Sequence, residues 1–298
     1  MSSAAGVPQS RHLHLPALAV ALRPHQWTKN LLLLAGLLFS GSLGDGARWG
    51  DALVALTAYC LLSSAGYLVN DVRDAASDRL HPTKRLRPVA SGELRPATAL
   101  VTAAALAGMG LGLAAAIGHA TLALAAAFAL GQLAYTLWLK RLMVLDAAMI
   151  AGLFVVRSAA GAEAIGVRIS TWLLVCTALL ALFLAFAKRR GELLAIGGDL
   201  SAGRAVLRHY TARRLELLVG ATAAGSCAAY IAYAVDGSDA AEMALTIPFV
   251  VFGLARYLYL MRRRDLGEEP DRVLLTDPPI LVAVVLWALV AATALNAG

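Results

Sequence analysis

The sequence predicts an all-α, polytopic membrane protein, and three features of its 298 residues support this fold class. Hydrophobic residues make up 59% of the chain and charged residues only 15%, whereas a soluble globular protein has about 25% charged residues. The apolar residues form runs of the length that a helix needs to cross a bilayer. The lysines and arginines lie almost entirely between alternate pairs of these runs. This pattern excludes a soluble enzyme, a disordered chain and a secreted disulfide scaffold.

The apolar runs account for nine transmembrane helices. Five runs carry no charged residue, and one of these is long enough for two helices with a break near Gly118; three further runs contain isolated charges. Residues 1–14 are expected to form a flexible tail, and residues 15–298 a single transmembrane domain. The expected spans are Leu15–Leu43, Ala52–Val69, Ala97–Leu139 as two helices, Val144–Ala162, Ile169–Ala187, Leu217–Val235, Met243–Met261 and Pro278–Gly298.

The basic residues predict how these helices are oriented. When the connections are numbered alternately, one side receives 22 lysines and arginines and the other side receives only Arg48 and Arg168. Cytoplasmic loops carry this excess in membrane proteins. We therefore expect a multi-pass protein of the plasma membrane, with the N-terminus and the polar loops in the cytoplasm and the C-terminus on the opposite side. The net charge of +7 then needs no nucleic acid to explain it.

Three aspartates follow the second expected helix. Asp71, Asp74 and Asp78 are spaced so that, at about 100° per residue, they share one narrow face at the cytoplasmic helix end. Unpaired carboxylates in this position would repel each other, and a divalent cation relieves that repulsion. Mg²⁺ prefers a few carboxylates together with the phosphates of a substrate. The alternative is a solvated loop with incidental acids, but aspartates at a helix C-terminus oppose the helix dipole.

Two groups of cations lie in the long cytoplasmic loops. Lys84, Arg85 and Arg87 follow the aspartates closely, as expected for a site that binds a polyphosphate. Ordinary loop charge is the alternative, and it explains their sign but not their close interleaving with acids. The second group is the run Lys188-Arg189-Arg190-Gly191-Glu192 after the sixth helix, with a simple interfacial anchor as its alternative. Further candidate substrate-binding residues are Lys29, Asn70, Tyr135, Lys140, Asp146, Arg157 and Tyr210.

These residues, in this order, resemble the UbiA superfamily of intramembrane prenyltransferases. The family pattern Asn-Asp-x-x-Asp-x-x-x-Asp after the second of nine helices is present here as Asn70, Asp71, Asp74 and Asp78. The resemblance extends over almost the whole chain. It implies a helical bundle with a central cavity that is open to the cytoplasm and, sideways, to the lipid.

The run after the sixth helix departs from the common family pattern. Aromatic prenyltransferases carry a second Asp-x-x-x-Asp motif there, whereas this chain has cations at Lys188 and Arg189. The sequence instead resembles one branch, the decaprenyl-phosphate phosphoribosyltransferases. That branch is similar in two strings, Arg-Pro-x-Gln-Trp-x-Lys-Asn from Arg23 and His-Pro-Thr-Lys-Arg-x-Arg-Pro from His81.

The resemblance to that branch implies transfer of 5-phosphoribose from 5-phosphoribosyl 1-diphosphate to a polyprenyl phosphate, with release of diphosphate. In actinobacteria this step supplies arabinose for the cell wall. Asp71, Asp74 and Asp78 are expected to hold Mg²⁺ and, with Lys188 and Glu192, to form the catalytic group. The remaining candidates are expected to bind the two phosphorylated substrates, a water-soluble donor that enters from the cytoplasm and a lipid acceptor in the bilayer. The pattern is compatible with a homo-oligomer.

Two other functions stay open at this point. A prenyltransferase that moves an isoprenyl chain to an aromatic or other small acceptor would use the same magnesium and the same aspartates. A transporter is the third alternative, but the chain shows no convincing inverted repeat, and its polar groups lie at the cytoplasmic helix ends and not at the bilayer midplane.

Overall fold

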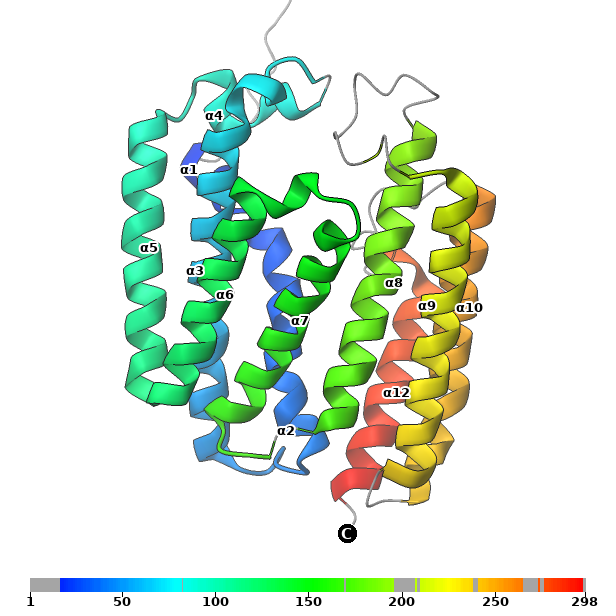
Figure 1. Cartoon of the computed structure of the whole chain (residues 1–298). Coiled ribbons are helices and arrows are strands. Elements are labelled where there is room, and N and C mark those ends of the chain that lie inside the picture. Colours follow the sequence, from blue (N-terminus) through cyan, green and yellow to red (C-terminus); the bar gives the residue numbers. More distant parts are fainter. Residues whose placement is uncertain are drawn as a thin grey trace, which may run out of the picture.

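The computed structural model describes residues 17–296 except 82, 169, 196–206, 208–209, 238–240, 265–272 and 274–275. Every regular element in these ranges is a helix, and the helices form one elongated bundle (Figure 1). The expected tail, residues 1–14, lies outside the described residues. The described chain begins with α1 near one end of the bundle, and the C-terminus lies at the other end.

Eight helices in the described part of the chain are long and apolar enough to cross a membrane. The first of them is α3. Among the connections between them are the 3₁₀ turns η2 (Lys84–Leu86) and η3 (Leu139–Arg141) and the short helix α4 (Pro88–Ser91). The long helices are α3 (Gly46–Asp78), α5 (Pro96–Ile117), α6 (His119–Leu137), α7 (Leu145–Ala164), α8 (Thr171–Ala195), α9 (Ala212–Ala232), extended by the π-helical turn η5 (Tyr233–Gly237), α10 (Ile247–Arg264), preceded by the 3₁₀ turn η6 (Ala241–Thr246), and α12 (Pro278–Asn296).

The first expected span differs from a continuous transmembrane helix. It is divided into α1 (Ala17–Leu22), the 3₁₀ helix η1 (Pro24–Leu34) and α2 (Ala35–Phe39), which follow one another along the bundle (Figure 1). Arg23 and Pro24 cause the first break, because Arg23 adopts a left-handed backbone with φ of 53° and a proline cannot continue the hydrogen bonding of α1. A 3₁₀ helix rises about 2.0 Å per residue, so the divided segment still covers more than the roughly 30 Å of a hydrocarbon core.

Helix α3 extends well beyond the run that was expected from hydropathy. Asp45 begins it by accepting hydrogen bonds from the backbone N–H groups of Ala47 and Arg48, and the helix then runs without a break through Asp78. Its 33 residues correspond to about 50 Å, roughly 20 Å more than a hydrocarbon core requires. The end of α3 that carries the aspartates can therefore leave the hydrocarbon layer without leaving the helix.

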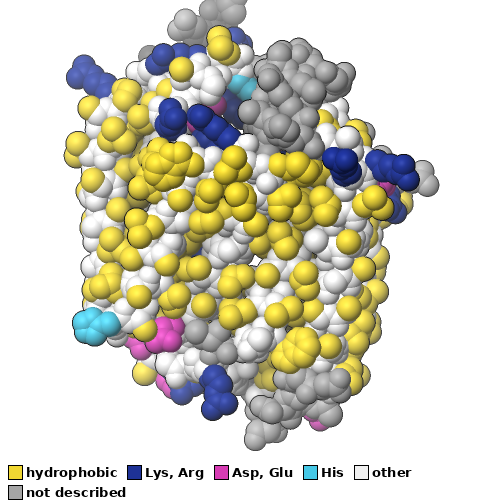
Figure 2. Space-filling view, in the orientation of Figure 1, with side chains coloured by type: hydrophobic (Ala, Val, Ile, Leu, Met, Phe, Trp, Pro, Cys, Tyr) yellow, Lys and Arg dark blue, Asp and Glu magenta, His cyan; other side chains and the backbone are white. Residues whose placement is uncertain are grey.

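The outer surface of the bundle is suited to lipid. Hydrophobic side chains cover its sides, and most of the lysines and arginines in view lie toward the end at which α4 is found (Figure 2). Large exposed apolar side chains occur along the long helices, among them Val101, Met109, Leu130 and Leu289. A multi-pass membrane protein accounts for this surface, and its orientation in the membrane stays a prediction from the loop charges.

Close packing against the interior holds the divided first span in place. An added Cβ at Gly161 of α7 would lie 2.1 Å from the backbone oxygen of Leu33 in η1, and a Cβ at Gly36 would lie 3.1 Å from the Cα of Ala162. The two backbones therefore touch, and neither glycine can carry a side chain without moving its neighbour. Small residues permit this kind of approach between membrane helices.

We predict that Gly161→Ala destabilises the protein, because the new methyl group would displace the backbone of η1. A loss of about 1–3 kcal/mol or more is expected, as for other overpacked sites. Gly152→Ala is the matched control, because Gly152 lies on the same helix and an added Cβ there meets nothing within 4 Å. The measurement is the thermal unfolding midpoint in detergent. Equal midpoints for the two variants would contradict the packing.

Candidate active site

The last two turns of α3 carry the three aspartates, and the structure places two of them on its buried face. Asp71 and Asp78 are 1% and 4% exposed, whereas the side chain of Asp74 is 27% exposed. A buried carboxylate is costly unless it is paired. The partners of these three residues therefore decide how this end of the bundle is built.

Each aspartate is paired with a cation from a different segment. Arg23, at the start of η1, donates to Asp71 Oδ1. Arg87 Nη1 lies 2.7 Å from Asp78 Oδ2 and 3.5 Å from Asp71 Oδ1. Lys140 Nζ, from η3, lies 2.6 and 2.8 Å from the two oxygens of Asp74. The aspartates thus join three segments that are distant in the sequence.

Asn70 belongs to the same group, because its Oδ1 accepts a hydrogen bond of 3.2 Å from Lys140 Nζ. The structure therefore brings together six of the residues that the sequence singled out. They are Asn70, Asp71, Asp74, Asp78, Arg87 and Lys140.

One oxygen of this group fits a metal ligand. Asp71 Oδ2 is buried and has no hydrogen-bond partner among the described residues. The described residues contain no group of three His, Cys, Asp or Glu side chains close enough to form a complete metal cluster. A site for Mg²⁺ does not require one, since this ion is usually held by one or two carboxylates, water and the phosphates of a substrate. The chemistry of the donors therefore fits Mg²⁺ that arrives with a phosphorylated ligand.

A second network lies at the same end of the bundle, around Arg189 of α8. Arg189 is 1% exposed. Its Nε lies 2.5 Å from Asp146 Oδ2, its Nη1 lies 2.8 Å from Glu192 Oε2, and its Nη2 lies 3.4 Å from the hydroxyl of Tyr135. The guanidinium group of Arg189 thus links α6, α7 and α8. The side chain of Glu192 is more exposed than that of Asp146.

Tyr210 completes the second network. Its hydroxyl accepts a hydrogen bond of 3.0 Å from the backbone N–H of Val144 and donates one of 3.4 Å to Asp146 Oδ1. Burial raises the pKa of this phenol, so it stays protonated and can donate at neutral pH. Both networks adjoin the end of α6 and η3, because Tyr135 belongs to the second network and Lys140 to the first.

Four further predicted residues make other contacts or are at least partly exposed. Lys29 Nζ is 2.6 Å from Gln26 Oε1, and the backbone N–H of Lys84 donates to the ring of His81. Arg85 is exposed, and Lys188 is partly buried beside Arg189.

Arg157 is deep in α7, as its position in the sequence suggested. It is 5% exposed, its Nε lies 2.8 Å from Asn30 Oδ1, and it stacks over the ring of Phe128. The helix places it 11 residues, or about 16 Å, from Asp146 along α7. Arg157 therefore joins α7 to η1 in the interior.

Arg23 is the site residue that the sequence did not assign. In the sequence it stands out only as the first residue of a string shared with the family branch, but the structure makes it the partner of Asp71. An ionisable residue within an apolar run is itself a signal, because such residues usually face a partner or a functional site.

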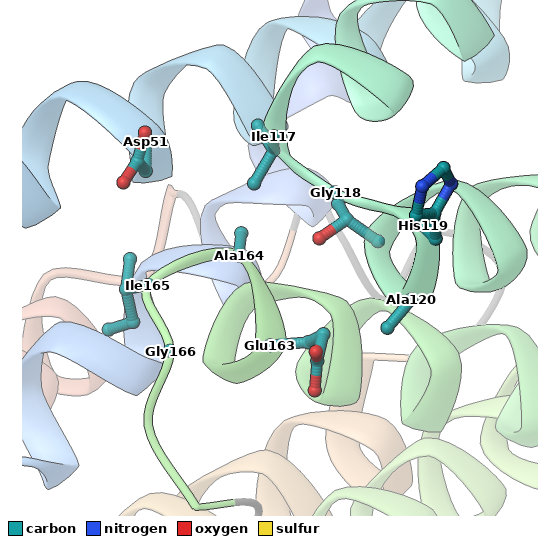
Figure 3. Close-up of a pocket in the computed structure, with 10 residues that line it drawn as sticks. Asp51, Ile117, Gly118, His119, Ala120, Glu163, Ala164, Ile165 and Gly166 are labelled. Carbon is teal, nitrogen blue, oxygen red and sulfur yellow. The ribbon is translucent and has the colours of Figure 1, made fainter.

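A cavity of about 430 Å³ lies elsewhere in the bundle (Figure 3). Asp51 of α3, His119 at the start of α6 and Glu163 near the end of α7 contribute to its lining. Asp51 precedes Asp71 by 20 residues on one continuous helix, which corresponds to about 30 Å. This cavity is therefore at the opposite end from the aspartate motif, and the expected central cavity stays a prediction.

The sequence matches a known protein family and named relatives. Residues 30–277 match the UbiA prenyltransferase family. The chain is 34% identical to the decaprenyl-phosphate phosphoribosyltransferase of Corynebacterium glutamicum over 280 residues, which cover 90% of this chain and 83% of that protein. It is 33% identical to the protein of the same name from Mycolicibacterium smegmatis, over 90% of this chain and 88% of that protein.

Solved structures show the same fold. A UbiA homolog from Archaeoglobus fulgidus bound to DMAPP and Mg²⁺ aligns with a TM-score of 0.74 at 18% identity, over 94% of this chain and 99% of that one. A digeranylgeranylglyceryl phosphate synthase aligns with a TM-score of 0.69 at 15% identity, over 95% of this chain and 98% of that one. At this level of identity the likeness concerns the fold alone.

We predict that Lys140→Gln increases the affinity of the donor-free protein for Mn²⁺, a spectroscopic substitute for Mg²⁺. The ammonium group of Lys140 competes with a metal for Asp74, so its removal should tighten binding roughly three- to tenfold. Arg141→Gln is the matched control, because the neighbouring Arg141 is exposed. Paramagnetic resonance of free Mn²⁺ gives the affinity. Measurable and equal binding of Mn²⁺ by the two variants would argue against a metal at Asp74.

Proposed function

Because the chain belongs to the UbiA prenyltransferase family, we propose that it is a phosphoribosyltransferase of the plasma membrane. It transfers 5-phosphoribose from 5-phosphoribosyl 1-diphosphate to a polyprenyl phosphate and releases diphosphate. The observation that carries this proposal is the arrangement of the second cluster. Arg189 is held at its centre by ion pairs with Asp146 and Glu192, at the place where the family resemblance leads us to expect a second aspartate motif in a prenyltransferase.

The donor diphosphate is assigned to the end of α3. Asp71 and Asp74 are the residues that would hold Mg²⁺, with Asp78 beside them, and the bound ion would offset the charge of the departing diphosphate. Arg23, Arg87 and Lys140 neutralise these carboxylates in the donor-free protein. Arg87 and Lys140 are assigned to the phosphate oxygens of the bound donor. Lys84 and Arg85, from the same loop as Arg87, add further positive charge for the same ligand.

The transfer step requires little acid–base chemistry from the protein. A phosphate monoester is largely ionised at neutral pH, so its oxygen attacks C1 of the ribose without a strong general base while the bond to the diphosphate breaks. The difficulty is the approach of two anions. Lys29 and Lys188 are assigned to the acceptor phosphate or the ribose 5-phosphate, where fixed positive charge lowers that repulsion. Glu192 is assigned to the ribose hydroxyl groups.

The acceptor reaches the site from the bilayer. Its isoprenoid tail lies along the apolar helix surfaces, and its phosphate lies at the interface, beside the ends of α3, α6 and α8. The donor is water-soluble and enters from the cytoplasm, which the loop charges place at this end of the bundle. The relatives from Corynebacterium and Mycolicibacterium bear the name of this reaction with a decaprenyl acceptor.

A second candidate function is prenyl transfer to an aromatic or other small acceptor. It is favoured by the fold shared with a UbiA homolog that binds DMAPP and Mg²⁺. A membrane assay separates the two functions. Radiolabelled 5-phosphoribosyl 1-diphosphate and polyprenyl phosphate should give a lipid-linked label that depends on Mg²⁺. Absence of this label, together with turnover of a prenyl diphosphate, would favour the second function instead.

We predict that Asp74→Asn lowers the rate of phosphoribosyl transfer by roughly 100-fold or more, because it removes a charge that offsets the metal. Asp51→Asn is the matched control on the same helix, at the opposite end of the bundle, and should retain the parental rate. Initial rates in detergent, with folding checked by the thermal midpoint, give the comparison. Near-parental turnover by a folded Asp74→Asn variant would rule out the metal assignment.

A further inference from the structure

The turn before α7 contains a strained residue. Val144 has φ of 68° and ψ of −46°, and the N–H of Leu145 donates to the carbonyl of Met143 at 2.8 Å. This is a γ-turn of the rarer hand, which is unfavourable for an L-residue and more so for a β-branched one. A residue held in such a region costs of order 1–3 kcal/mol and persists only where its surroundings enforce it. The surroundings of Val144 are therefore informative.

Packing of the Val144 side chain does not enforce the turn, because that side chain is 49% exposed. The backbone is held locally by the N–H of Asp146, which donates to the carbonyl of Leu142 at 3.0 Å. It is held from a distant segment by Tyr210, whose hydroxyl accepts a hydrogen bond of 3.0 Å from the Val144 N–H. Tyr210 is 4% exposed, and its own backbone N–H is bonded to the carbonyl of Leu207. The phenol thus ties the turn to a segment that is 66 residues away in the sequence.

The same hydroxyl group controls Asp146, two residues after the strained position. It donates to Asp146 Oδ1 at 3.4 Å, and Arg189 Nε occupies Oδ2 at 2.5 Å. Asp146 is fully buried, so both of its oxygens are used inside the protein. Arg189 continues the chain of contacts to Glu192 at 2.8 Å. A shift of the turn would therefore move Asp146, then Arg189, and finally Glu192.

We propose that Tyr210 and Val144 are positioning residues, and that the hydroxyl of Tyr210 clamps the strained turn so that Asp146 and Arg189 fix Glu192 at the donor site. This inference rests on the proposed function, because it assigns Glu192 to the ribose of the donor. It also changes the role expected for Tyr210, which was direct contact with substrate. A hydroxyl has one proton to donate, and Asp146 takes it, while the Val144 N–H uses one of its lone pairs.

The strained turn allows an experiment that distinguishes a positioning role of Tyr210 from direct contact with the substrate. Glycine adopts positive φ without a steric penalty, so in a Val144→Gly background the turn no longer depends on a clamp. Four proteins are compared: the parent, Tyr210→Phe, Val144→Gly and the double variant. The rate constant kcat and the KM for 5-phosphoribosyl 1-diphosphate are measured for each, together with the thermal midpoint without substrate.

The clamp predicts strong coupling between the two substitutions. Tyr210→Phe alone should lower kcat roughly 10- to 100-fold, as expected when a catalytic group is misplaced, with a smaller change in KM. The same substitution in the Val144→Gly background should lower kcat by a factor at least threefold smaller, because only the hydrogen bond to Asp146 Oδ1 is then lost. The thermal midpoint should show the same non-additivity. Tyr230→Phe, which removes another buried hydroxyl hydrogen-bonded to Thr246 at 2.6 Å, is the control and should leave kcat at the parental value.

Other outcomes overturn the proposal. An equal loss of kcat in both backgrounds would mean that Tyr210 acts through Asp146 alone or on the substrate, and not through the turn. Coupling in the thermal midpoint without coupling in kcat would reduce the clamp to a structural role. A parent that transfers no phosphoribose would refute the proposed function, while the thermal midpoints of the four proteins would still decide whether the clamp exists. The two failures are therefore distinguishable.

Discussion

The pairing of buried carboxylates with cations from distant segments is the constraint on which this end of the bundle depends. Asp71 and Asp146 are almost completely buried where α3 ends and α7 begins, and neither could remain charged there alone. Their counter-charges come from Arg23 in the first span and from Arg189 in α8. The aspartates therefore fix how the helices meet, as well as supplying the chemistry of the site.

This constraint explains the form of the first span. The break in this span coincides with the residue that supplies the guanidinium group to Asp71. The chain breaks at Arg23, in a left-handed conformation, and continues as a 3₁₀ helix that packs its backbone on Gly161. The two non-glycine residues with positive φ in the described ranges are Arg23 and Val144. Both belong to the networks of the site, where strained residues tend to cluster.

Sequence patterns were sufficient for part of this account. Hydropathy located eight of the spans because a bilayer imposes their length, and the helical spacing of the aspartates placed them together on one helix end. The family resemblance was confirmed by the match over residues 30–277. The patterns could not predict the division of the first span, nor that Arg189 would be shared by Asp146 and Glu192. Those contacts depend on tertiary packing between residues far apart in the chain, which no local period encodes.

The central claim is that the carboxylates of Asp71 and Asp74 exchange internal cations for a metal that arrives with the donor. Anomalous diffraction from crystals grown with Mn²⁺ and 5-phosphoribosyl 1-diphosphate tests it most directly. The account predicts a metal peak about 2.1 Å from oxygens of these carboxylates and of the diphosphate, with Lys140 moved from Asp74 toward a phosphate. A bound donor without metal at α3, and with the ion pairs of Asp71 and Asp74 intact, would contradict it.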